Sequence, residues 1–334
     1  MGESTKIQWT DATWNPWQGC TKVSPACANC YMFRDMKRYG RDGSIVRRSA
    51  QKTFELPINR KRDKSFAIPS GWKVFTCSWS DWFHEAADDW RPEAWEVIRQ
   101  RPDVTFQIVT KRTDRIAACL PADWGNGWSN VWLIATVENQ EWADVRIPQL
   151  LGVPAVVHGL SMEPVLGPVD IAEYLGVPCD YCTKIEAFGL RPEDCPYCEG
   201  TRQARGYRNG WMLPASVNWV ITGGESGHGS RPTNPEWFRS IRDQCQAAGV
   251  PYFHKQNGEF VDECHPACHD ENGYVLDFEN NESFVEFEYD DEGRAIDYRG
   301  VYMLKVGAKR AGRLLDGREW SEFPAEFGRE PSRA

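Results

Sequence analysis

The sequence contains no uninterrupted run of about 18 apolar residues, the length that a membrane-spanning helix needs. Its first residues, MGESTKIQWTD, also lack the basic-then-apolar pattern of a signal peptide. The 334 residues are 41% hydrophobic, so the chain can bury a large core and form one large domain or two ordinary ones. We therefore expect a cytoplasmic protein with no membrane partner.

Two common catalytic signatures are also missing. No G-x-x-x-x-G-K-[ST] loop for binding phosphates occurs. The stretch from Gly224 to His228 misses the G-x-S-x-G nucleophile elbow, because His228 stands where the second glycine is needed. ATP hydrolysis and Ser-His-Asp acyl transfer are therefore disfavoured. We interpret His84, beside Trp82 and Phe83, as a packed or surface side chain and not as a general base.

Acidic residues outnumber basic ones, 48 to 39, but positive charge is concentrated in one segment. The net charge of −9 argues against a basic coat for nucleic acid. Residues 34–64, however, contain eleven Lys and Arg against four Asp and Glu, whereas residues 270–297 contain eleven acidic residues and one Arg. The basic stretch indicates either a solvated surface or a contact with DNA or RNA. If nucleic acid binds at this stretch, three tryptophans elsewhere in the chain could stack on an unpaired base: Trp79, Trp82 and Trp128.

Six short apolar segments each lead into a polar stretch and are predicted to be buried parallel strands. Apart from one longer gap, their starts are roughly 25 to 33 residues apart, the length of a strand plus a crossover helix. Helices are predicted at 92–101 and at 235–248, with Asn234 as a cap and Gly249 at the end. The pattern predicts an α/β fold, either a full or partial (β/α) barrel or a doubly wound sheet. The segments start near Lys73, Thr105, Asn130, Ala155, Asn218 and Pro251, and an initial strand is expected at 12–18.

The longer gap holds an insertion, residues 174–211, with the spacing C-x2-C-x12-C-x2-C. Paired knuckles at this spacing are typical of a structural zinc site, because four thiolates complete the coordination of the ion. Unrelated surface or redox cysteines are the alternative. The predicted zinc ligands are Cys179, Cys182, Cys195 and Cys198.

After Gln256 the regular alternation stops. We expect a barrel domain over 1–260, interrupted by the 174–211 insertion, and then an acidic appendage with a C-terminal anchor over 261–334. The appendage contains a C-H-x2-C-H pattern, which either binds a metal or consists of exposed polar residues beside a loop. Its members are Cys264, His265, Cys268 and His269.

Polar residues follow every predicted strand. Ligands of barrels and open α/β sheets bind beyond the carboxyl ends of the strands, so these residues together predict a binding site. Taken singly, each could be a helix cap or a solvated loop residue. The candidates are Ser78, Ser80, Asp81, Lys111, Arg112, Glu138, Asn139, Ser161, Glu163, Gly223, Gly224, Glu225, Ser226, Lys255 and Gln256.

Three cysteines near the N-terminus have the spacing Cys20-x6-Cys27-x2-Cys30, with no fourth cysteine or histidine nearby. A structural zinc site needs four ligands, and a catalytic one mixes histidine or carboxylate with water. A [4Fe-4S] cluster held by three cysteines leaves one iron open for a substrate or cofactor. The spacing favours such a cluster, and the alternatives are zinc completed by a distant ligand or no metal.

Several motifs along the chain carry a resemblance to a known family: GCTKVSPACANCY, CSWSDWFHE, IVTKR, TVEN, LSMEPVLGPVD, WVITGGESG with GSRP, FHKQNGE and AGRLLDGREW. Together they resemble a phage-associated family of unknown function that carries a three-cysteine motif and is similar to radical S-adenosylmethionine enzymes. The resemblance extends from about Trp9 to Glu259, resumes at AGRLLDGREW, and leaves out the zinc-like insertion and the acidic stretch. Radical S-adenosylmethionine enzymes most often use C-x3-C-x2-C, whereas the first gap here is six residues.

This resemblance implies a barrel of the radical S-adenosylmethionine type, in which Cys20, Cys27 and Cys30 ligate a [4Fe-4S] cluster. The open iron would chelate S-adenosylmethionine, and an electron from a donor such as flavodoxin or ferredoxin would release a 5′-deoxyadenosyl radical. The expected substrate is a base of DNA or RNA. The alternative is a non-catalytic, zinc-stabilised phage protein that binds nucleic acid. The expected cofactor contacts are Ser80 and Asp81 for the ammonium, Glu138, Asn139 or Glu163 for the ribose, and Gly223, Gly224, Glu225 and Lys255 for further contacts.

Overall fold

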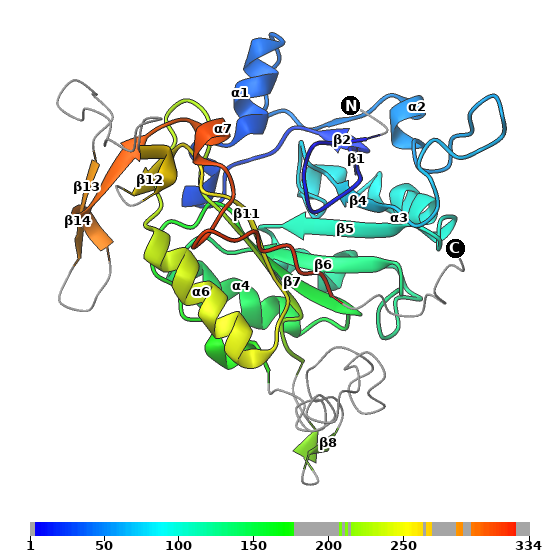
Figure 1. Ribbon diagram of the computed structural model, residues 1–334. Coiled ribbons are helices and arrows are strands. Elements are labelled where there is room, and N and C mark those ends of the chain that lie inside the picture. Colours follow the sequence, from blue (N-terminus) through cyan, green and yellow to red (C-terminus); the bar gives the residue numbers. More distant parts are fainter. Residues whose placement is uncertain are drawn as a thin grey trace.

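A curled sheet of seven parallel strands forms the centre of the computed structural model (Figure 1). Strands that follow one another along the chain lie side by side in the sheet, and the order never reverses. All crossovers therefore pass on the same side, as in a (β/α) barrel and unlike a doubly wound sheet. In sheet order the strands are β1 (Ala12–Trp14), β4 (Lys73–Thr76), β5 (Thr105–Thr110), β6 (Val131–Thr136), β7 (Val157–Met162), β10 (Trp219–Gly223) and β11 (Tyr252–Gln256).

The structure describes residues 4–176, 207–208, 211–212, 215–262, 265–268, 285–289 and 295–324. The four predicted zinc ligands, Cys179, Cys182, Cys195 and Cys198, lie outside these residues. Cys264 and His269 of the C-H-x2-C-H pattern lie outside them as well.

The sheet confirms the predicted α/β fold with parallel strands. Each of the six apolar segments forms one strand that begins within two residues of its expected start. The initial strand expected at 12–18 is present as β1, followed by the short strand β2 (Trp17–Gln18). Since β1 and β11 are the two edges, the sheet is a half-barrel, and the partial (β/α) barrel is the prediction that holds.

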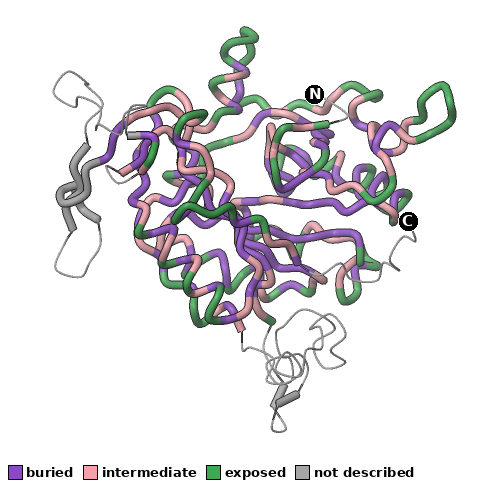
Figure 2. The backbone as a smooth tube through the Cα atoms, viewed as in Figure 1, coloured by how far each residue is buried: buried purple, intermediate pink, exposed green. Residues whose placement is uncertain are grey.

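Both faces of the sheet are buried (Figure 2), which explains why its strands are continuously apolar. Side chains alternate between the two faces along each strand. In β6, Leu133 and Ala135 belong to the main core beneath the helices, whereas Trp132 and Ile134 belong to a second cluster on the concave face. Trp219 of β10 also lies in that second cluster, which contains no helical residue.

Helices cover the outer face of the sheet, and Figure 1 shows α4 and α6 against it. The predicted helix at 235–248 is confirmed as α6: the Asn234 side chain accepts a hydrogen bond from the Glu236 N–H (3.0 Å), and Gly249 adopts a left-handed φ of 67°. Among the helices within the described ranges, none has the length and apolar composition of a membrane span. The α-helices are α1 (Tyr31–Arg38), α2 (Gln51–Phe54), α3 (Arg91–Arg99), α4 (Gln140–Leu151), α6 (Pro235–Ala248) and α7 (Ala308–Ala311), and the 3-10 helices are η1 (Pro25–Cys27), η2 (Glu85–Ala87), η3 (Thr113–Arg115), η4 (Ala117–Cys119), η5 (Ala172–Tyr174) and η7 (Pro266–Cys268).

The chain after β11 forms a small antiparallel sheet and then returns to the half-barrel. Residues 312–324 run along β11, where the His254 N–H donates to the Trp320 carbonyl (3.0 Å) and the Glu322 N–H donates to the Tyr252 carbonyl (3.2 Å). This segment pairs with an edge that would otherwise expose its backbone groups. The remaining strands are β3 (Arg47–Arg48), which pairs with β2, β8 (Tyr207–Arg208), which pairs with β9 (Trp211–Met212), and β12 (Phe260–Asp262), β14 (Ala295–Lys305) and β13 (Val285–Tyr289) of the antiparallel sheet.

Candidate functional site

A cavity of about 560 Å³ lies at the carboxyl ends of the strands, on the concave side of the sheet. Inward-facing strand positions form part of its wall: Phe75 on β4, Val109 on β5 and Thr136 on β6. The three cysteines of the N-terminal motif and twelve of the fifteen strand-end candidates line this one cavity. They are Cys20, Cys27, Cys30, Ser78, Ser80, Asp81, Lys111, Arg112, Ser161, Glu163, Gly224, Glu225, Ser226, Lys255 and Gln256.

The cysteine loop, residues 19–30, is tied to strand ends that are distant in sequence. The Ala26 N–H donates to the Glu138 carboxylate after β6 (3.2 Å). The Asn29 side-chain amide donates to the Glu225 carboxylate after β10 (3.0 Å). These contacts bridge 112 and 196 residues of chain, so the fold itself positions the three thiols at the cavity.

Glu225 connects the cysteine loop to Arg231. Its carboxylate accepts two side-chain hydrogen bonds from Arg231 (3.0 and 2.7 Å), and Arg231 also donates to the Pro25 carbonyl (3.1 Å). Burial alone would raise the pKa of the Glu225 carboxyl, but hydrogen bonds from Arg231 and Asn29 hold it below its ordinary value. Glu225 is therefore ionised, and its hydrogen bonds hold the cysteine loop in place.

Cys20 lies beside a buried arginine. The Arg112 Nη1 atom is 3.5 Å from Cys20 Sγ and 3.4 Å from Asp81 Oδ2, and Nη2 donates to the Thr21 hydroxyl (2.7 Å). Burial and the Asp81 carboxylate raise the pKa of the Cys20 thiol to about 11, while Arg112 acts in the opposite direction. Metal binding at Cys20 would therefore release a proton, and Arg112 would stabilise the thiolate that remains.

Asp81 and Ser80 line the cavity, but their side-chain oxygens also form hydrogen bonds that fix the neighbouring loops. The Asp81 carboxylate accepts hydrogen bonds from the Thr110 hydroxyl (2.7 Å) and the Lys111 N–H (2.9 Å), which joins the end of β4 to the end of β5. The Ser80 hydroxyl donates to the Gly19 carbonyl (2.5 Å) at the start of the cysteine loop. Their predicted contact with a methionine ammonium stays a prediction.

Glu163 and Lys255 present opposite charges to the cavity. The Lys255 Nζ atom is 2.8 Å from Glu163 Oε1, and the Ser161 hydroxyl lies 3.4 Å from Glu163 Oε2. Their side chains stay partly exposed, 25% for Lys255 and 13% for Glu163. A neighbouring carboxylate and ammonium can bind a ligand that carries both an amino and a carboxyl group.

Three predicted cofactor contacts do not line the cavity. Glu138 is fully buried and pairs with Arg146 of α4 at 2.7 Å. Asn139 caps α4 by accepting a hydrogen bond from a backbone N–H of its first turn (3.1 Å). A side chain at Gly223 would come within 2.9 Å of the Glu163 carboxylate. In the structure these residues support the strand ends, and their proposed roles at a ribose or cofactor stay predictions.

A comparison with protein-family models matches residues 4–324 to the family described as protein of unknown function (DUF5131). The chain belongs to this family. No curated protein and no solved structure matches the sequence. The match supports one part of the predicted resemblance, namely that the chain belongs to a family of unknown function. The link to phages and to radical S-adenosylmethionine enzymes stays a prediction.

Three residues that build the site of this DUF5131 chain were not predicted from the sequence. Cys77 is 2% exposed, has a left-handed φ of 58° and lines the cavity directly after β4. Its position next to Ser78 at a predicted strand end was an available signal. No local pattern shows that Asn29 and Arg231 tie down the cysteine loop, because their contacts bridge 196 and 206 residues of chain.

The tryptophans proposed to stack on a base have different surroundings. Trp82 is fully buried in the core of the DUF5131 fold, so the prediction that it stacks on a base is wrong. Trp128 packs against Trp124 (5.8 Å between ring centroids). Trp79 lines the cavity and pairs with the exposed Tyr39 (6.2 Å), so it alone of the three borders the cysteines. His84 is buried and caps η2, which confirms its interpretation as a packed side chain.

A [4Fe-4S] cluster at the three thiols stays a prediction, with zinc completed by a distant ligand as an alternative. In the described part of the DUF5131 chain, no group of three or more His, Cys, Asp or Glu side chains could hold one metal ion. Cys20, Cys27 and Cys30 are nevertheless free and line the same cavity. Each thiolate of a [4Fe-4S] cluster binds a separate iron, so such ligands stand further apart than those of one zinc ion.

Proposed function

We propose that this protein is a radical S-adenosylmethionine enzyme that acts on a base of DNA or RNA. Cys20, Cys27 and Cys30 would hold a [4Fe-4S] cluster, which together with S-adenosylmethionine supplies a 5′-deoxyadenosyl radical for hydrogen abstraction. One observation carries the proposal: three closely spaced thiols line the same cavity as the polar strand ends of a parallel half-barrel.

The cavity wall offers separate surfaces for the two ends of S-adenosylmethionine. Glu163 and Lys255 carry the charges that complement a methionine carboxylate and ammonium. Trp9, Phe75 and Val109 form an apolar part of the same wall, against which an adenine ring would pack. The chain would thus orient the cofactor by charge at one end and by apolar contact at the other.

The cysteine loop would limit water access to the reacting groups. It is tied down through the Asn29–Glu225 hydrogen bond and through Arg231, which joins Glu225 to the Pro25 carbonyl. Excluding water protects a radical from side reactions and strengthens the electrostatic contacts inside the cavity. These contacts give the loop a role in positioning besides its thiols.

The preference for a nucleic acid comes from the charge around the cavity. Exposed Arg34, Lys37 and Arg38 lie on α1, directly after the third cysteine. Arg34 also packs against Gly227, in the loop that follows β10. Phosphates attracted to these cations would bring a base close to the cavity.

The test is anaerobic incubation of the iron-loaded protein with S-adenosylmethionine and dithionite, with 5′-deoxyadenosine measured by mass spectrometry. We expect product from the natural protein and loss of product in Cys27→Ala. Cys119→Ala is the matched control, because this free cysteine does not line the cavity. Iron-loaded natural protein that forms no 5′-deoxyadenosine would overturn the proposal.

A further inference from the structure

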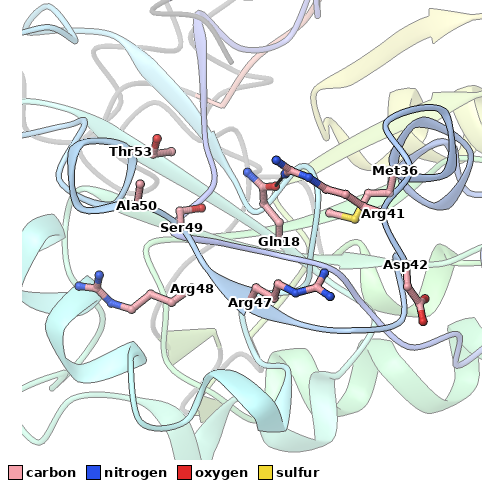
Figure 3. A pocket seen from close by; sticks show the side chains of 10 residues that line it. Gln18, Met36, Arg41, Asp42, Arg47, Arg48, Ser49, Ala50 and Thr53 are labelled. Atoms are coloured by element: carbon pink, nitrogen blue, oxygen red, sulfur yellow. Dashed lines mark hydrogen bonds between the residues drawn. The ribbon is translucent and has the colours of Figure 1, made fainter.

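A second cavity, of about 580 Å³, lies between β2, β3 and the chain that joins α1 to β3 (Figure 3). We call it the arginine pocket, because Arg41, Arg47 and Arg48 all line it. Gln18 and Ser49 add polar groups to the same wall. None of the cysteines and none of the strand-end candidates line it, so it is separate from the cysteine cavity.

Two of the three guanidinium groups are available to an anion. Arg48 forms an ion pair with Glu93 (2.6 Å), and Figure 3 shows its side chain extending away from Arg47, as expected for neighbours in a strand. Arg47 is exposed and has no ion-pair partner within 4 Å among the residues that the structure describes. Arg41 is exposed as well, and the hydrogen bond that its guanidinium donates to neutral Gln18 is long at 3.4 Å.

The single carboxylate in the lining does not cancel this charge. Asp42 accepts hydrogen bonds from the Ser44 N–H (2.8 Å) and the Ser44 hydroxyl (2.7 Å) in a local turn. Those hydrogen bonds, with a smaller contribution from Arg47, hold the pKa of Asp42 below its ordinary value. Asp42 is thus a fixed negative charge engaged by its own turn, and the three arginines of the lining outnumber it.

The chain segment that lines the arginine pocket contacts residues that line the cysteine cavity. The Cys20 N–H donates to the carbonyl of Gly43, in the loop that carries the pocket arginines (2.9 Å). Tyr39, which immediately precedes the pocket-lining segment, pairs with Trp79 of the cysteine cavity at 6.2 Å between ring centroids and 34° between ring planes. The side chain next to the arginine pocket is therefore in contact with a side chain of the cysteine cavity.

Exposed apolar side chains gather in the same region. Six large hydrophobic residues are exposed in the described part of the chain, and four of them lie within residues 23–45: Val23, Tyr31, Tyr39 and Ile45. Tyr39 is 67% exposed and stands among the cations of α1 and the pocket. Exposed aromatic rings interleaved with cations are the combination that binds unpaired nucleotides by stacking and charge.

We infer that the arginine pocket binds a backbone phosphate of single-stranded DNA or RNA, while a neighbouring base stacks on Tyr39. Guanidinium groups suit this task because each can donate two parallel hydrogen bonds to the oxygens of one phosphate. The strand would then pass Trp79 and present its next nucleotide to the cysteine cavity. Only the destination of the strand rests on the proposed function, since the binding itself requires neither a cluster nor a cofactor.

The test is fluorescence polarisation with a labelled oligonucleotide of about 12 nucleotides, within the range that single-strand sites cover. The double variant Arg41→Ala/Arg47→Ala should weaken binding at least about tenfold and reduce the slope of log K against log salt concentration by about 0.7, the value for one lost phosphate contact. The matched control, Arg62→Ala/Lys64→Asn, removes the same charge from the same basic stretch outside the pocket. Asparagine suits position 64 because its φ is 67°. The control should weaken binding less than about threefold.

Further arms test stacking and the nature of the strand. Tyr39→Ala should weaken binding, and Tyr39→Phe should restore it, because the ring and not the hydroxyl stacks. Deoxy and ribo forms of the same oligonucleotide identify which nucleic acid is preferred. Equal losses in the pocket and control variants, or a duplex bound as tightly as the single strand, would overturn the inference. Because no S-adenosylmethionine is present, these results are independent of the 5′-deoxyadenosine test.

Discussion

Glu138 illustrates how a polar side chain at a strand end can serve the fold. Its carboxylate is fully buried, pairs with the buried Arg146 and accepts a hydrogen bond from the Ala26 N–H. A buried charge without its partner is strongly unfavourable. This side chain therefore links α4, β6 and the cysteine loop. Replacing only one partner of the ion pair should destabilise the fold.

Glu138→Gln should lower the free energy of unfolding by about 3 to 5 kcal/mol, because it leaves the Arg146 charge buried without a carboxylate. The double variant Glu138→Leu/Arg146→Met should regain most of that loss, since both charges are then gone. Urea denaturation of the natural protein and both variants measures the difference. If Glu138→Gln is as stable as the natural protein and instead weakens S-adenosylmethionine binding, Glu138 is a cofactor ligand.

The cysteine loop is the element whose position depends most on long-range contacts. Only η1 within it is regular, and its anchors come from the residues after β6 and β10. Arg231 is central because it holds both Glu225 and the Pro25 carbonyl. Removing it leaves the core untouched but releases one side of the loop.

Arg231→Ala should accelerate hydrogen exchange of the amides in residues 19–30, while the global midpoint of unfolding changes little. Arg239→Ala is the matched control, because Arg239 is similarly exposed (30% against 27%) and pairs with Glu236 and Asp316 away from the loop. Exchange measured by mass spectrometry on peptides covering the loop checks the prediction. Unchanged exchange in Arg231→Ala would show that Arg231 does not hold the loop.

The stability of the whole molecule should depend on a buried histidine that does not line the cavity. His254 is fully buried in β11, where its ring lies 3.0 Å from the Thr222 hydroxyl and 2.9 Å from the Asn257 side-chain oxygen. Burial lowers its pKa from 6.5 to about 4. The unfolded chain therefore takes up a proton below about pH 6.5, whereas the folded chain resists protonation down to about pH 4.

Folding stability should consequently fall as the pH falls through this window. From pH 7 to pH 5, His254 should cost about 2 kcal/mol of unfolding free energy. His254→Gln keeps a hydrogen-bonding side chain that cannot become charged, so it should lose about 2 kcal/mol less over the same range. Urea denaturation at both pH values provides the measurement. Equal losses in the two proteins would contradict a neutral buried His254.

Most of the fold followed from local sequence patterns. Continuous apolar segments at strand-plus-helix spacing predicted all six later strands, and the Asn234 cap with Gly249 predicted α6. The polar strand ends predicted the cavity, because parallel strands place them at one edge. Long-range partners were not predictable. Nothing local distinguishes Glu138, which pairs with Arg146, from Glu163, which faces the cavity, or shows that Trp82 is buried.

The most direct test of the central claim is the iron content and electron paramagnetic resonance spectrum of anaerobically reconstituted protein. We predict about four irons per chain and, after reduction, a cluster signal that changes when S-adenosylmethionine is added. Cys20→Ala, Cys27→Ala and Cys30→Ala should each lose the signal, whereas Cys119→Ala should keep it. Zinc without iron after reconstitution, or a signal that survives all three substitutions, would contradict the account.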